Sequence, residues 1–129
     1  MNRISFIVVG KNQEKTIYDC LKSIYVTIAD NKLKDYEVIF VDSDSKDRTV
    51  EIIKSQFPDV RLVYLKGRLN TGIAKNNGAA RATGDIYFFI DGDITLDHKF
   101  ISHVYDHDEG LRYDLVSGKL EEILYNDRW

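Results

Sequence analysis

The stretch 87-YFFIDGDITL-96 decides how this chain is interpreted. Its first four residues are apolar, and they run directly into Asp91, Gly92 and Asp93. A short apolar run that stops at a turn signal is typical of a buried strand. Two carboxylates this close repel one another unless a cation lies beside them. The stretch therefore predicts a buried strand over 86–90 that ends in two acidic groups with a chemical purpose.

Strand-like and helix-like segments alternate through the chain before this stretch. Apolar, β-branched runs predict buried strands over 4–9, 36–41 and 60–65. Apolar residues at helical spacing, or a small-residue pattern, predict helices over 13–28, 49–56 and 71–82. In the last of these helices, small residues spaced by four allow close approach to a neighbour: Ala74, Gly78 and Ala82. This alternation predicts an α/β fold with three αβα layers and a mostly parallel sheet.

Individual residues mark where the predicted helices begin and end. Asn12 is a candidate N-cap for the first helix, and Ser45 or Asp47 for the second. Pro58 stops the second helix, because proline cannot continue one. Gly84 is a candidate end for the third helix.

The composition limits the classes of function. The chain has 129 residues, enough for one domain, with 43% hydrophobic and 30% charged residues, as in soluble globular proteins. A net charge of −3 gives no electrostatic support for nucleic acid as the main partner. The one cysteine, Cys20, excludes an internal disulfide and is expected on the buried face of a helix. The apolar run 4–9 is too short to span a membrane, so we expect a cytoplasmic protein. Peripheral association with the inner face of the membrane stays open.

Polar groups follow every predicted strand. Ligands of parallel sheets bind beyond the carboxyl ends of the strands. The four strands deliver, in order, Gly10-Lys11-Asn12, Asp42-Ser43-Asp44, Lys66-Gly67-Arg68 with Asn70, and Asp91-Gly92-Asp93. In an extended backbone Asp91 and Asp93 would lie on one side, roughly 6.6 Å apart, with no side chain at Gly92 to block an ion. Mg²⁺ and Mn²⁺ take oxygen ligands of this kind, with phosphates completing the shell.

Two further features suit a nucleotide. Asp42 ends a buried strand and can accept a hydrogen bond from a nucleobase N–H or a ribose hydroxyl. The helix predicted after Asn70 has Lys75 nearby, and a helix N-terminus with basic side chains suits a phosphate. The chain has neither a phosphate-binding P-loop nor a Gly-x-Gly-x-x-Gly dinucleotide fingerprint.

Together these motifs resemble the nucleotide-sugar-binding half of a family 2 glycosyltransferase with the GT-A fold. The resemblance covers 4–96 and has four parts in order: 4-ISFIVVGKNQE-14, 42-DSDSKDRT-49, the segment from Asn70 to Gly84, and Asp91-Gly92-Asp93. Each motif is weak alone. The chain departs from the family pattern at Val9, Lys11, Ser43 and Asp44, and at Lys75, where arginine is usual.

The resemblance implies roles for individual residues. Asp42 would bind the nucleobase, which in this family is commonly uracil. Asp91 would face the ribose or sugar, and Asp93 would hold Mn²⁺ or Mg²⁺ on the diphosphate, with Asp91 as a second ligand. The full implied nucleotide-sugar set is Val9, Gly10, Asn12, Glu14, Asp42, Asp44, Arg68, Asn70, Gly72, Lys75, Asp91 and Gly92.

The resemblance also implies a reaction. A sugar would move from a UDP-sugar to a hydroxyl of a glycan, lipid-linked or polysaccharide acceptor, with inversion. The general base of inverting members comes later in the chain, and only 36 residues follow Asp93. We therefore expect one GT-A type domain over 1–129 that is incomplete on the acceptor side, with a further strand over 113–125 and the base beyond Trp129.

Two other functions fit parts of the sequence. The stretch 88-FFIDGDITL-96 also matches the first motif of haloacid-dehalogenase phosphatases, in which Asp91 would be the nucleophile. That alternative leaves Asp42 and 70–84 unexplained. A non-catalytic nucleotide-sugar-binding module is the second alternative. The histidines His98, His103 and His107 lack a third grouped ligand, so we interpret them as solvated.

Overall fold

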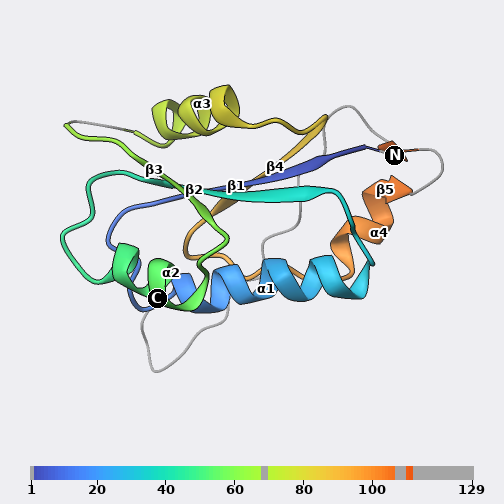
Figure 1. The fold of residues 1–129 in the computed structure, drawn as a ribbon, viewed down its shortest axis with the longest axis horizontal. Coiled ribbons are helices and arrows are strands. Elements are labelled where there is room, and N and C mark those ends of the chain that lie inside the picture. The colour runs from blue at the N-terminus through green and yellow to red at the C-terminus, as the bar shows by residue number, and fades with distance from the viewer. Residues whose placement is uncertain (1, 68–69, 107–109, 112–129) are drawn as a thin grey trace, which may run out of the picture.

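The computed structural model describes residues 2–67, 70–106 and 110–111 of the chain (Figure 1). The elements in order are β1 (Ile4–Gly10), α1 (Ile17–Asp30), β2 (Tyr36–Asp42), α2 (Thr49–Gln56), β3 (Arg61–Tyr64), α3 (Thr71–Arg81), β4 (Ile86–Asp91), α4 (Phe100–Val104), β5 (Tyr105–Asp106) and β6 (Gly110–Leu111). Helix α3 covers one face of the main sheet, and α1 and α2 cover the other (Figure 1). The predicted αβα layering is confirmed. The strand predicted over 113–125 lies outside the described residues.

The main sheet has the strand order β3-β2-β1-β4, and all of its strands are parallel. Strand β1 is therefore paired on both sides. Its last residues meet the acidic ends of its neighbours, because Gly10 pairs with Asp42 and Val9 pairs with Asp91. This register places Asp42 and Asp91 on either side of the end of β1. Strands β5 and β6 form a separate antiparallel pair.

The sheet is covered by apolar side chains on both faces, as its near-continuous apolar strands predict. Alternate residues of β1 and β2, such as Phe6 and Phe40, pack with Leu21 and Ile24 on the α1 side. The residues between them face α3: Ile7, Val9, Ile39 and Val41, with Ala74. The close approach predicted for α3 is confirmed, because a Cβ on Gly78 would lie 2.5 Å from Ile7 Cγ2 and 3.1 Å from Val41 Cγ2.

The prediction for the start of the first helix was wrong. Helix α1 begins at Ile17 and not at Gln13, because the amides of Thr16 and Ile17 both donate to the Gln13 carbonyl and close a turn. Asn12 is not the N-cap of this helix. It has a φ of 54°, and its side-chain oxygen accepts a hydrogen bond from the amide of Lys46. The second helix begins at Thr49 as predicted, and it ends at Gln56, before Pro58.

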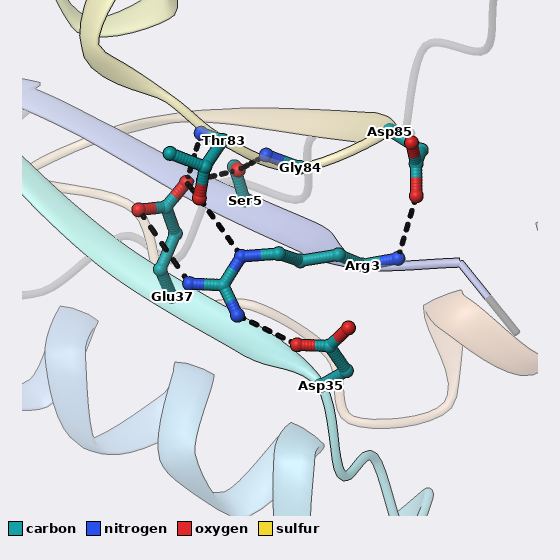
Figure 2. A network of polar contacts seen from close by, with 7 residues as sticks. All are labelled: Arg3, Ser5, Asp35, Glu37, Thr83, Gly84 and Asp85. Atoms are coloured by element: carbon teal, nitrogen blue, oxygen red, sulfur yellow. Dashed lines mark hydrogen bonds and ion pairs between the residues drawn. The ribbon is translucent and has the colours of Figure 1, made fainter.

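A polar network joins β1, β2 and the start of β4 at the edge opposite the acidic residues (Figure 2). Ser5 is fully buried, and its hydroxyl donates to Glu37 Oε2 at 2.6 Å and accepts from the amide of Gly84 at 2.9 Å. The amide of Thr83 donates to the same carboxylate oxygen. The guanidinium group of Arg3 lies 3.9 Å from the other carboxylate oxygen of Glu37, Oε1. Burial acts to raise the pKa of Glu37, but the bonds from Ser5 and Thr83 and the charge of Arg3 outweigh it and lower the pKa.

Gly84 belongs to this network and does not end the third helix. Helix α3 ends at Arg81, and Ala82 after it is already extended. A Cβ on Gly84 would clash with Ser5 Oγ and would lie 2.8 Å from the Arg3 carbonyl. The glycine therefore permits close contact between two strands at this point. No helix in the described part of the chain is long and apolar enough to cross a membrane.

Candidate functional site

Two carboxylate oxygens at the carboxyl edge of the sheet are buried without a hydrogen-bond partner. They are Oδ1 of Asp42 and Oδ1 of Asp91, and no other side-chain nitrogen or oxygen of the described residues shares this state. The second oxygen of Asp42 accepts from the Ser45 amide at 3.0 Å, which fixes the carboxylate while Oδ1 stays unpaired. The Nζ of Lys75 lies 3.9 Å from Asp91 Oδ1, too far for a hydrogen bond. A buried acceptor without a donor costs about 1–3 kcal/mol, so this edge is suited to a ligand that supplies donors or positive charge.

The acidic residues after β4 lie on a turn. The strand ends at Asp91, and the amide of Ile94 donates to the Asp91 carbonyl at 3.0 Å. The extended spacing expected for Asp91 and Asp93 does not apply, because the chain bends between them. Asp91 is half-exposed as a side chain although its Oδ1 atom is buried, and Asp93 is exposed, so solvent reaches part of both side chains.

Gly92 in this turn is buried, and its missing side chain faces protein. Its amide donates to the Val9 carbonyl at 2.8 Å. A Cβ on Gly92 would lie 3.3 Å from both the Val9 carbonyl oxygen and Gln13 Cγ. Packing against β1 therefore explains the glycine, and the expected approach of an ion over its Cα is not needed to explain it. The carbonyl of Val9 is likewise already bonded within the fold.

The loop after β1 is bonded to the loop after β2 by side chains that cross between them. The amide of Asn12 donates to Ser45 Oγ, and the amide of Lys46 donates back to Asn12 Oδ1, both at 2.8 Å. The amide of Ser43 donates to the Gly10 carbonyl at 3.0 Å. Asn12, expected to contact the nucleotide-sugar, uses its side-chain oxygen for this bridge. The two loops form one rigid rim beside Asp42.

Asp47 completes the rim from the start of α2. Its carboxylate accepts bonds from the amide of Glu14 and from the amide and hydroxyl of Thr49. Burial acts to raise the pKa of Asp47, but these bonds outweigh it and lower the pKa. The capping role expected of Ser45 or Asp47 is not filled by either residue, because the N-cap of α2 is Arg48, which makes no side-chain capping bond. Asp47 binds the Thr49 amide from the position before the N-cap. Glu14 joins the rim through its backbone and leaves its side chain exposed.

Asp44 lies on the outer part of the same rim. It has a φ of 65°, in the left-handed region that aspartate tolerates better than most residues. Its carboxylate pairs with Lys46 Nζ at 3.1 Å. Asp44, another of the expected contacts, is therefore held in a fixed position but is already neutralised by a lysine.

Helix α3 points its N-terminus toward the edge at which the strands end. Asn70 caps the helix, and its side-chain oxygen accepts from the amide of Ile73 at 2.8 Å. Gly72 follows in the exposed first turn, and Lys75 reaches back toward Asp91. The helix N-terminus expected at this edge is thus present, with Asn70 bonded to the helix itself, and its contact with a phosphate stays a prediction. Arg68 lies outside the described residues.

The model described as glycosyl transferase family 2 matches residues 5–129. This chain belongs to glycosyl transferase family 2. The match confirms the resemblance drawn from the four motifs. It also argues against the phosphatase alternative, because the match spans residues 5–129 and so includes Asp91.

Named glycosyltransferases are among its relatives. The SPbeta prophage-derived glycosyltransferase SunS of Bacillus subtilis is 37% identical over 86 residues, which cover 67% of this chain and 19% of that protein. The glycosyltransferase AglE of Haloferax volcanii is 27% identical over 92% of this chain and 39% of that protein. The chain therefore spans about a fifth to two fifths of the length of these relatives.

Solved glycosyltransferases share the fold. The mannosyltransferase PcManGT of Pyrobaculum calidifontis, in complex with GDP-Man and Mn²⁺, matches with a TM-score of 0.60 and 29% identity over 71% of this chain and 28% of that one. The glucosyl-3-phosphoglycerate synthase of Mycobacterium tuberculosis matches with a TM-score of 0.59 and 29% identity over 80% of this chain and 37% of that one. Its crystal contains Mn²⁺, UDP and phosphoglyceric acid.

The oxygen ligands that this family 2 chain offers at the carboxyl edge of its sheet fit a divalent metal ion. Asp91 and Asp93 offer carboxylate oxygens, and Asp91 Oδ1 has no hydrogen-bond partner. No group of three or more His, Cys, Asp or Glu side chains suited to a metal occurs in the described part of the chain. Mg²⁺ commonly uses one or two carboxylates together with substrate phosphates and water, so two carboxylates suffice.

The histidines and the cysteine lie outside this metal site. His98 pairs with Asp30 at 2.7 Å, and His103 is exposed on α4. His107 lies outside the described residues. Cys20 is buried behind the acidic turn, and burial, with the nearby Asp93 and Asp91 charges, raises the pKa of its thiol to about 12. It behaves as a small apolar residue, as expected.

Proposed function

We propose that this chain is the donor-binding portion of a glycosyltransferase that takes its sugar from a nucleoside diphosphate sugar. The observation that carries the proposal is the pair of unpartnered oxygens, Asp42 Oδ1 and Asp91 Oδ1, on either side of the end of β1. One elongated ligand that offers N–H or O–H donors at one end and a sugar at the other can satisfy both. The chain over 1–129 would then be one GT-A type domain that lacks its acceptor side.

In this proposal the residues at the edge divide the donor between them. Asp42 accepts from the nucleobase, on a carboxylate that Ser45 already orients. Asp91 accepts from ribose or sugar hydroxyls. Lys75 and the exposed N-terminus of α3 face the diphosphate, where positive charge and free amides favour phosphate oxygens. Arg68 is proposed from the sequence alone as a further positive charge for the same group.

Asp93 and Asp91 would hold Mn²⁺ or Mg²⁺. When bound, the ion supplies positive charge that stabilises the nucleoside diphosphate as it leaves the anomeric carbon. The protein keeps the two carboxylates in place and excludes water from Asp42. We further propose an inverting reaction on a glycan, lipid-linked or polysaccharide acceptor, with the general base outside this chain.

Uridine is the proposed nucleoside. The synthase of Mycobacterium tuberculosis was crystallised with UDP, which favours uridine, whereas PcManGT was crystallised with GDP-Man. Isothermal titration calorimetry of the chain with UDP, GDP and uridine, with and without Mn²⁺, tests the proposal. We expect UDP to bind more tightly than GDP, and Mn²⁺ to strengthen binding of UDP but not of uridine. A folded sample that binds none of these ligands would contradict the proposed function.

A non-catalytic binding module predicts the same calorimetry. If the natural protein continues past Trp129, its full-length form separates the two, because only a transferase releases UDP from a UDP-sugar when an acceptor is added. Binding without release under those conditions would favour the module.

A further inference from the structure

The turn that precedes α1 contacts the acidic turn formed by Asp91, Gly92 and Asp93, although the two turns lie far apart in the sequence. Thr16 Oγ1 lies 3.1 Å from the Gly92 carbonyl oxygen and 2.8 Å from the side-chain oxygen position of Gln13. A hydroxyl has one proton to donate and can also accept. The Gln13 amide can present its NH₂ group instead of its oxygen. In that orientation Gln13 donates to Thr16, and Thr16 donates to Gly92, so both contacts are satisfied.

Gln13 is held where this bond needs it. Its backbone N–H donates to Thr49 Oγ1 at 2.8 Å, which ties Gln13 to the start of α2. Its aliphatic stem lies over two glycines, because a Cβ on Gly10 would be 3.0 Å from Gln13 Cγ, and a Cβ on Gly92 would be 3.3 Å from it. The Gln13 stem therefore helps to exclude a Cβ at both glycines, together with Phe40 at Gly10 and the Val9 carbonyl at Gly92.

The hydroxyl of Thr16 does not cap the helix that it precedes. Thr16 is the N-cap residue of α1, but its side chain makes no capping bond. Its remaining contact, 3.4 Å to the Gln13 carbonyl, is long. The hydroxyl can therefore be removed without the loss of a helix cap.

We propose that Thr16, oriented by Gln13, is a positioning residue for Asp93. The Gly92 carbonyl belongs to the same rigid peptide plane as the Asp93 amide. A bond to this carbonyl therefore fixes the direction in which the chain enters Asp93. The two carboxylates repel each other when no cation is present, and this anchor opposes the resulting rotation of the turn. The consequence for metal and nucleotide rests on the proposed function, but the anchoring of the turn does not.

Hydrogen exchange on the ligand-free chain tests the anchor directly. The amides of Gly92 and Ile94 are bonded to Val9 and Asp91 and report the closed turn. Thr16→Val, which keeps the shape and removes the hydroxyl, is expected to speed exchange at both amides roughly two- to ten-fold, as the loss of one hydrogen bond predicts. Thr16→Ser should restore the slow exchange.

Thr27→Val is the matched control on the same helix. Thr27 is fully buried, and its hydroxyl donates to the Ser23 carbonyl at 2.8 Å, so this bond lies within α1. It should alter the melting temperature without changing exchange at Gly92 and Ile94. Equal exchange at these amides in wild type and Thr16→Val, or failure of Thr16→Ser to restore it, would overturn the proposal.

A second readout connects the anchor to the ligand. Thr16→Val is expected to weaken Mn²⁺-supported UDP binding several-fold and to leave uridine binding unchanged, because uridine does not need Asp93. If wild type binds no UDP while Thr16→Val still speeds exchange, the proposed function fails and the anchor stands. If wild type binds UDP and exchange is unchanged, the anchor fails and the function stands.

Discussion

The ammonium group of Lys75 lies 3.9 Å from the Asp91 oxygen that has no hydrogen-bond partner. The lysine comes from the second turn of α3 and the aspartate from the end of β4, so the contact joins the helix face of the site to its acidic turn. At this distance the charges attract, but the carboxylate remains free to accept from a ligand. The arrangement suits a lysine that shares its charge between Asp91 and a phosphate.

Lys75→Met should weaken UDP binding in the presence of Mn²⁺ by about ten-fold, because one positive charge near the diphosphate is lost. Lys75→Arg should retain most of the affinity. Titration calorimetry measures both. Lys54→Met is the control. Lys54 is on α2, over the ring of Tyr64 from β3, and it carries the same charge on the face of the sheet opposite α3. Equal losses for Lys75→Met and Lys54→Met would contradict a local role for Lys75.

Asp93→Ala and Asp42→Ala should separate the metal from the nucleobase. We expect Asp93→Ala to abolish the increase in UDP affinity that Mn²⁺ produces. We expect Asp42→Ala to weaken UDP binding both with and without Mn²⁺, because the base contact does not depend on the ion. Calorimetry at several Mn²⁺ concentrations measures this difference. Identical behaviour of the two variants would show that the separate assignment is wrong.

Gly78→Ala should destabilise the fold by about 1–3 kcal/mol, because the new methyl group would overpack Ile7 and Val41. Urea unfolding followed by circular dichroism measures the change. Gly72→Ala in the same helix is the control: its Cβ would meet only Asn70 Oδ1, at 3.3 Å. This control should be neutral or slightly stabilising, since alanine is the better helix former. A stable Gly78→Ala variant would mean that α3 can move away from the sheet.

Glu37→Gln should lower stability at neutral pH and change its acid dependence. The pKa of Glu37 is lowered in the fold from 4.5, so its charge stabilises the protein fully above that value. This stabilisation is lost as pH falls through the lowered folded pKa. The difference in unfolding free energy between wild type and Glu37→Gln should therefore be constant at neutral pH and shrink below about 4.5.

Urea unfolding at a series of pH values checks this dependence. Glu51→Gln is the control, because Glu51 pairs with Arg48 on the exposed surface of α2, where an ion pair contributes little. Its effect should be near zero across the range. A difference between wild type and Glu37→Gln that persists unchanged to low pH would contradict the linkage.

The three layers, and the meeting of Asp42 and Asp91 at the carboxyl edge of the sheet, could be predicted from sequence because both follow from local patterns. An apolar run such as 4–9 specifies a strand buried on both faces, and alternation with helices specifies parallel pairing. Once pairing is parallel, Asp42 and Asp91 must meet at one edge. The spacing of Asp91 and Asp93 could not be predicted in the same way, because the chain bends after Asp91.

The errors share a physical cause. Asn12, Gly84 and Thr16 take their partners from distant parts of the chain: Lys46, Ser5 and Gly92. Helix-capping rules consider only the nearest few residues, and so they assigned Asn12 and Gly84 to the adjacent helices. Thr16 gave no signal at all, because a threonine before an apolar helix is also an ordinary N-cap. The three-dimensional contacts were needed to separate these roles.

The central place of β1 affects how the protein can be synthesised. Strand β1 precedes both of its partners in the chain. One edge of β1 pairs with residues 36–42, and its other edge pairs only with residues 86–91. A nascent chain therefore carries an apolar strand with an open edge until β4 has left the ribosome. Such edges are templates for pairing with other chains. Slow translation between β3 and β4 would lengthen this exposure, and this is the interval in which chaperone contact would matter most.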